Sequence, residues 1–96
     1  MRGRSIMNKK LIVISAVWCP SCLLLKKDLK KLKDNYNDIE IETLDYDFDE
    51  DEVKKLEIGD KLPVVICYKE DKEISRLIGE KNYDEIVKFI KDCDLI

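Results

Sequence analysis

The first half of the chain changes from a continuous hydrophobic run to a helical repeat. Leu11–Ala16 is almost entirely apolar, which is typical of a strand buried on both faces. From about Pro20 to Tyr36, apolar residues recur at helical spacing and lysines fill the remaining surface. The repeating residues are Leu25, Leu29, Leu32 and Tyr36. This pattern predicts a buried strand over 11–17 and an amphipathic helix over 20–36, with Pro20 in its first turn.

The middle of the chain is shorter in its elements and strongly acidic. Residues 39–43 alternate between apolar and polar side chains, which indicates a strand nearer the edge of a sheet. The acidic stretch 45–52 reads as a loop that leads into a short helix at about 50–57, since acids favour helix N-termini. Gly59 is expected to stop that helix.

The second half repeats the buried-strand signal and ends in a helix. Pro63–Tyr68 is a second apolar strand, Lys69–Lys72 makes a turn, and 73–78 returns as a polar-studded edge strand. After Gly79, a terminal helix is marked by an inner stripe of Tyr83, Ile86, Val87, Ile90 and Cys93.

The order of elements predicts an α/β fold, β-α-β-α-β-β-α, with a four-stranded mixed sheet and helices on both faces. The two most apolar strands, first and third, should lie side by side at the centre of the sheet. The first two strands are joined through a helix and should be parallel. The last two are joined by a short turn and should be antiparallel.

Length and charge limit the classes of protein. A chain of 96 residues makes one domain, and a net charge of −3 argues against general binding of nucleic acid. No apolar run approaches the roughly 20 residues that a membrane span needs. Residues 8–17 resemble a secretory signal but lack a small-residue cleavage site, which favours a cytoplasmic protein. We expect a disordered leader over 1–8 and a single domain over 9–96.

The chemistry is concentrated in Trp18-Cys19-Pro20-Ser21-Cys22, at the junction of the first strand and the first helix. A helix start supplies free N–H groups and partial positive charge, which stabilise a thiolate at Cys19. Cys22 follows one helical turn later, close enough to attack a mixed disulfide formed by Cys19. This arrangement points to thiol–disulfide exchange, in which the thiolate is the nucleophile.

Half of a zinc site and a structural disulfide are the alternatives for this pair. Zinc needs four ligands, but the chain contains no histidine, and its other cysteines, Cys67 and Cys93, are far apart. A structural disulfide across so short a loop would constrain little of the unfolded chain. Cys67 and Cys93 are expected to be buried packing residues, with an intermolecular disulfide through Cys93 as the alternative. The acids at 45, 47 and 49 lack the glycine and glutamate that a calcium loop requires.

Together, three features resemble the thioredoxin-fold family. They are the Trp18–Cys22 motif, Leu62-Pro63 at the start of the third strand, 41 residues after Cys22, and Gly79 a further 16 residues on. The resemblance implies a cis peptide bond at Leu62-Pro63 facing the cysteines. It also implies a docking surface formed by Trp18, Pro20, Ser21, Leu62 and Pro63.

The resemblance further implies a protein-disulfide oxidoreductase that needs no bound cofactor. Cys19 and Cys22 would cycle between dithiol and disulfide on protein substrates, and an external reductase or a small-thiol donor would restore the dithiol. We expect a monomer.

Departures from the family pattern keep two other functions open. Thioredoxins commonly bury an aspartate six residues before the first cysteine, where this chain has Val13. A glutaredoxin-like enzyme that uses glutathione is disfavoured, because no lysine precedes the motif and Glu80 follows Gly79. The remaining alternative is a binding module that holds a metal or a partner without turnover.

Overall fold

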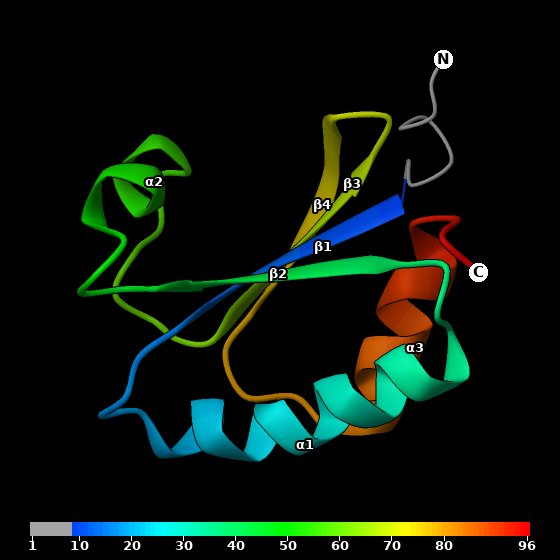
Figure 1. Cartoon of the computed structure of the whole chain (residues 1–96), viewed down its shortest axis with the longest axis horizontal. Coiled ribbons are helices and arrows are strands. Elements are labelled where there is room, and N and C mark those ends of the chain that lie inside the picture. The colour runs from blue at the N-terminus through cyan, green and yellow to red at the C-terminus, as the bar shows by residue number, and fades with distance from the viewer. Residues whose placement is uncertain (1–8) are drawn as a thin grey trace.

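A computed structural model describes residues 9–96 of the chain, so the expected leader over 1–8 lies outside the described residues. The elements occur in the predicted order (Figure 1). They are β1 (Lys9–Ser15), α1 (Pro20–Asn35), β2 (Glu40–Asp45), α2 (Glu50–Lys55), β3 (Val64–Lys69), β4 (Lys72–Ile78) and α3 (Tyr83–Asp92). The predicted bounds differ from these by one or two residues at most ends.

The sheet has the strand order β2-β1-β3-β4, so the two most apolar strands are central as predicted. β1 is parallel to β2 and antiparallel to β3, and β3 is antiparallel to β4. The β3–β4 turn passes through Glu70 and Asp71, which both have positive φ. Two such residues match the tight hairpin turns that fit the twist of paired strands.

The two central strands are apolar along their middle residues because helices cover both faces of the sheet. Leu11, Val13, Val65 and Cys67 pack on one face with the inner residues of α1 and α3. Ile14, Val64 and Ile66 pack on the other face with Val53 of α2. Figure 1 shows α1 and α3 below the sheet and α2 at its far upper left. Because side chains alternate between the two faces along each strand, the central strands contribute to a hydrophobic core on each face of the sheet, and neither face is left to solvent.

Local signals set the helix ends, with one correction. α3 begins with a capping box, in which Asn82 accepts from Glu85 N and the Glu85 side chain accepts from Asn82 N. The prediction that Gly59 stops the second helix is wrong, because α2 ends at Lys55. The chain turns away at Glu57, whose φ is 55°.

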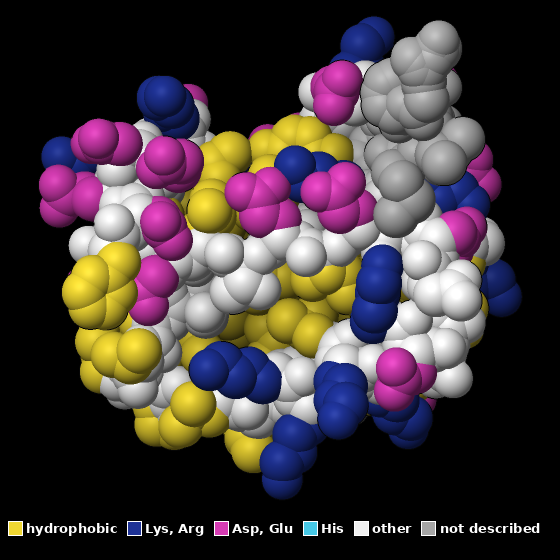
Figure 2. All heavy atoms as spheres, viewed as in Figure 1, with side chains coloured by type: hydrophobic (Ala, Val, Ile, Leu, Met, Phe, Trp, Pro, Cys, Tyr) yellow, Lys and Arg dark blue, Asp and Glu magenta, His cyan; other side chains and the backbone are white. Residues whose placement is uncertain are grey.

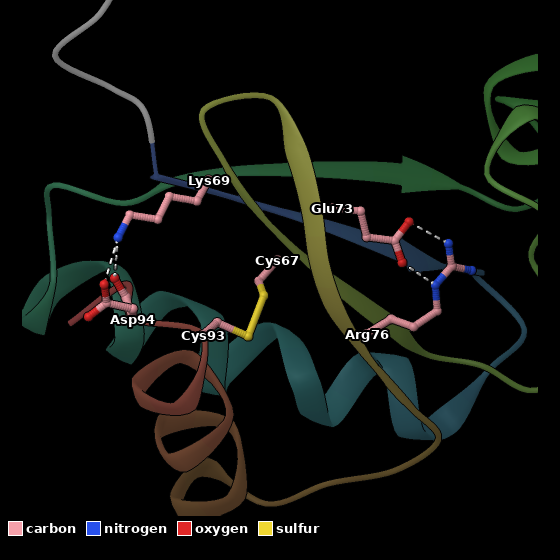
Figure 3. The surroundings of a disulfide bond; sticks show 6 residues. All are labelled: Cys67, Lys69, Glu73, Arg76, Cys93 and Asp94. Carbon is pink, nitrogen blue, oxygen red and sulfur yellow. Dashed lines mark hydrogen bonds and ion pairs between the residues drawn. A yellow bond between two sulfur atoms is a disulfide. The ribbon is translucent and has the colours of Figure 1, made fainter.

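Cys67 and Cys93 form a disulfide that joins β3 to the end of α3 (Figure 3). Both were expected to be buried, and they are 0% and 4% exposed. Their pairing was missed, and the alternative of an intermolecular disulfide through Cys93 is wrong because Cys67 is its partner. The two cysteines are 26 residues apart in the sequence. Only the packing of α3 across β3 brings them together.

Candidate functional site

Cys19 is the N-cap residue of α1, immediately after the turn that leaves β1. Its backbone N–H donates to the carbonyl of Ala16 at 3.1 Å, and its own carbonyl accepts from Cys22 N at 3.1 Å. No side chain caps this helix start, and Pro20 occupies the first helical position. The free N–H groups and the positive end of the helix dipole therefore lie at Cys19.

The two thiols are free and lie in a small buried cluster with Ala16. Cys19 is 6% and Cys22 2% exposed, and Tyr46 and Leu62 pack against them. Burial, reinforced by a hydrogen bond with Cys19, raises the pKa of Cys22 from 9.0 to about 11. Cys22 is consequently a thiol at neutral pH and must lose a proton before it can act as a nucleophile.

Val13, six residues before Cys19, is a buried apolar residue of β1. It is buried on β1 between Thr43 of β2 and Val65 of β3. Among residues 9–96, no polar or charged residue is buried. The site therefore offers no buried base for the proton of Cys22.

The start of β3 and the end of β4 complete the site. The Leu62–Pro63 peptide bond is cis, and the carbonyl of Pro63 accepts from Gly79 N at 2.8 Å. The next residue, Glu80, accepts from the Ser21 hydroxyl at 2.7 Å. Three chain segments that are distant in sequence thus meet beside the cysteines.

Trp18 lies at the rim of the site, fixed by the loop that follows β2. Its Nε1 donates to Asp47 at 2.7 Å, and its ring stands edge-on to Tyr46 at a centroid distance of 6.3 Å. Trp18 is nevertheless 59% exposed, and Phe48 in the same loop is 81% exposed. Figure 2 shows hydrophobic side chains at the lower left of the molecule, where β1 joins α1. Lysines lie along α1 and acids over α2.

The structure brings all seven predicted site residues into one region and adds three that the sequence analysis missed. Trp18 to Cys22 are contiguous, and Leu62 packs against the cysteine cluster with Pro63 beside it. The missed residues are Tyr46, Asp47 and Glu80. Tyr46 and Asp47 could have been found, because parallel strands end at the same edge of a sheet and β2 ends one residue before Tyr46. Glu80 follows Gly79, which entered the sequence analysis only as a spacing feature of the family, so the sequence did not place Glu80 at the site.

Within residues 9–96, no group of three or more His, Cys, Asp or Glu side chains could hold a metal ion. No helix in the same range is long and apolar enough to cross a membrane.

Comparisons with known proteins agree with this geometry. The thioredoxin family model matches residues 4–92, so the chain belongs to the thioredoxin family. A comparison with curated protein sequences finds no significant match. Among solved structures, the chain is similar to mitochondrial thioredoxin 3 from Saccharomyces cerevisiae in its oxidised form. That match has 30% identity and a TM-score of 0.81, and it covers 88% of this chain and 78% of the other.

Two further solved structures are similar. One comes from a study of thiol resolution in a yeast mitochondrial 1-Cys peroxiredoxin by glutathione and thioredoxin systems. It has 29% identity and a TM-score of 0.81, and the match covers 88% of this chain and 78% of that one. Fasciola hepatica thioredoxin shares the fold at 20% identity with a TM-score of 0.83, covering 92% and 83% of the two chains. The family and the paired thiols define a thiol–disulfide oxidoreductase.

Proposed function

We propose that this protein reduces disulfides in protein substrates through a Cys19/Cys22 dithiol–disulfide cycle. The observation that carries the proposal is the position of Cys19 as an uncapped helix N-cap residue beside a second free thiol. The Cys19 thiolate attacks one sulfur of the substrate disulfide, and the other sulfur leaves as a thiolate. The product is a mixed disulfide through Cys19.

Cys22 resolves the mixed disulfide after it loses its proton. In the dithiol protein, burial and a hydrogen bond with Cys19 raise the pKa of Cys22 to about 11, so Cys22 enters the reaction as a thiol and needs a base before it can attack. Because Val13 replaces a carboxylate and no buried base is near, the leaving substrate thiolate takes the proton, directly or through water. The Cys22 thiolate then attacks Cys19, releases the second substrate thiol and leaves the Cys19–Cys22 disulfide.

The docking surface consists of Trp18, Pro20, Ser21, Leu62 and Pro63, extended by Phe48. Exposed Trp18 and Phe48 provide apolar contact area, and the backbone beside the cis bond at Leu62 suits an extended substrate segment. No cofactor takes part in this cycle. An external reductase or a small-thiol donor returns the oxidised pair to the dithiol, and the protein acts as a monomer.

The direct test is to trap the intermediate. Cys22→Ser should accumulate a mixed disulfide through Cys19 when it is mixed with a protein disulfide substrate and analysed by mass spectrometry. Cys19→Ser is the matched control and should trap none. Trapping through Cys22 would reverse the two roles, and thiols that react with no disulfide would favour the binding module.

The reduction potential of the pair decides the direction of electron flow. Titration of Cys19–Cys22 against defined thiol/disulfide buffers should give about −250 mV or lower, as for a protein that keeps others reduced. A value above about −200 mV would make the protein an oxidant or an isomerase. The cytoplasmic location stays a prediction, and a stable Cys67–Cys93 disulfide would be unusual there, because cytosolic thiols are mostly kept reduced.

A further inference from the structure

The second pair of cysteines has no place in the proposed cycle. Cys67 lies in β3, which pairs with β1 on one side and β4 on the other, at the register Leu11↔Cys67↔Ser75. Cys93 is the C-cap residue of α3. Both belong to the core cluster on the α1/α3 face, whereas Cys19 and Cys22 form a separate cluster.

We propose that Cys67–Cys93 is a redox-dependent clamp that holds the end of α3 on the sheet and stays oxidised while Cys19–Cys22 cycles. The bridge closes a segment that contains β4 and α3. Figure 3 shows it spanning from β3 to the last turn of α3, with the Lys69–Asp94 ion pair beside it. When the bridge is open, the contacts that remain at the end of α3 are packing and the exposed contacts of Lys69 with the carboxylate and carbonyl of Asp94.

The surroundings of the bridge protect it from thiol attack. Cys67 is fully buried, and Leu95, also fully buried, is held over the same core by a hydrogen bond from its N–H to Ile90 O. Cys93 lies at the negative end of a helix dipole, where a leaving thiolate is disfavoured. Disulfide exchange slows when the leaving thiolate is poorly stabilised and when the sulfur is inaccessible. Cys19 lies at the opposite, positive end of a helix.

Opening the clamp is a balanced two-electron exchange with an external dithiol. A thiolate of the dithiol attacks one sulfur of the bridge and breaks the Cys67–Cys93 bond. The second thiol of the dithiol then attacks the dithiol sulfur of the mixed disulfide, breaks its bond to the cysteine and releases that cysteine as a thiol. The dithiol becomes a disulfide, and Cys67 and Cys93 each gain one electron and one proton.

The contacts between this segment and the catalytic site do not depend on the bridge. Gly79 is held by Pro63 O, and β4 pairs with β3 up to Val64↔Ile78. Glu80 is held by Ser21. The clamp therefore controls the stability of the folded protein and leaves turnover unchanged.

The first test is stepwise reduction of the full-length, fully oxidised chain with increasing dithiothreitol, followed by alkylation and mass mapping. Cys19 and Cys22 should be alkylated first, and Cys67 and Cys93 only at much higher dithiol concentration or in denaturant. Alkylation of all four together would overturn the proposal. So would free thiols at Cys67 and Cys93 before any reductant is added.

The second test isolates the clamp in a Cys19→Ser/Cys22→Ser variant, in which Cys67–Cys93 is the only disulfide. Reduction should lower its unfolding midpoint by roughly 10 °C or more. An unchanged midpoint would overturn the clamp. In the converse variant, Cys67→Ala/Cys93→Ala, disulfide reductase activity well below the midpoint should stay within about twofold of the parent. A large loss there would place the bridge in the catalytic cycle, whereas full activity in Cys19→Ser would refute the proposed function instead.

Discussion

Two pairs of cysteines in one small chain differ in almost everything except burial. Cys19 and Cys22 are separated by two residues and lie free at the start of α1. Cys67 and Cys93 are 26 residues apart and are bonded at the end of α3. All four are at most 6% exposed. Burial alone therefore does not determine the role of a cysteine. Whether it takes part in thiol–disulfide exchange or forms a structural disulfide depends on the helix end at which it lies and on the segments around it.

The largest expected difference between the two cysteine pairs is in the catalytic rate. Cys19→Ser should lower the rate of protein-disulfide reduction by about 10³-fold or more, because a serine hydroxyl without an activating base is not a nucleophile at neutral pH. Cys93→Ala should keep the rate within about twofold. The measurement is reduction of a protein disulfide with a chemical donor, at a temperature where both variants are folded. Equal losses in the two variants would erase the distinction between the pairs.

For the stability of the fold, we expect the Cys67–Cys93 pair to matter more than the Cys19–Cys22 pair. Reducing Cys67–Cys93 in the Cys19→Ser/Cys22→Ser variant should cost about 3 to 4 kcal/mol of unfolding free energy, because a loop of this length is no longer closed in the unfolded chain. Cys19–Cys22 closes a far shorter loop, so reducing it in Cys67→Ala/Cys93→Ala should cost less. Denaturant unfolding of each variant, oxidised and reduced, measures both. A larger cost at the site pair would contradict the clamp.

The pH dependence separates the pairs again. The pKa of Cys22 is raised from 9.0 to about 11 in the folded protein, so the folded state holds this proton more tightly than the unfolded state. The associated stability is complete below about pH 9 and is lost as the pH rises to about 11, on the order of 2 to 3 kcal/mol at most. This loss of stability at alkaline pH should appear in the reduced Cys67→Ala/Cys93→Ala variant, and it should disappear when Cys22→Ser is added. An identical alkaline loss in both would assign it to other groups.

The smallest effect concerns the rim of the site. Asp47→Ala removes the acceptor of the Trp18 indole, so Trp18 becomes less fixed and the KM for a protein substrate should rise about two- to fivefold, equivalent to about 1 kcal/mol or less. The Trp18 fluorescence should change as well. Asp51→Ala, in the first turn of α2, is the matched control and should change neither. A shift in kcat alone would argue against a docking role.

Much of the fold could be predicted because its signals are local. The continuous apolar runs of β1 and β3 marked the two central strands, and the leucine spacing of α1 marked a helix that packs on them. The helix stop at Gly59 was wrong, because Glu57 takes up the positive φ before the glycine is reached. A residue other than glycine can adopt a positive φ at a modest cost in free energy. The preference of glycine for that conformation therefore does not reveal which residue ends the helix.

The site was predicted only in part, for a related reason. The Trp18–Cys22 motif is contiguous and carries its own helix start, so its chemistry could be inferred from sequence. Asp47 and Glu80 reach the same site from the ends of β2 and β4. Asp47 could have been placed there from the parallel pairing of β1 and β2, whereas nothing in the sequence connects Glu80 to the motif.

The sequence by itself determined the strands, the helices and the exchange-competent cysteine pair, because each depends on residues within one or two turns of chain. Only the tertiary structure decided that Cys67 meets Cys93, and which side chains surround Trp18 and Ser21. The physical reason is that strand register and helix packing bring together residues tens of positions apart. Those contacts exist only when the whole sheet and its helices are in place.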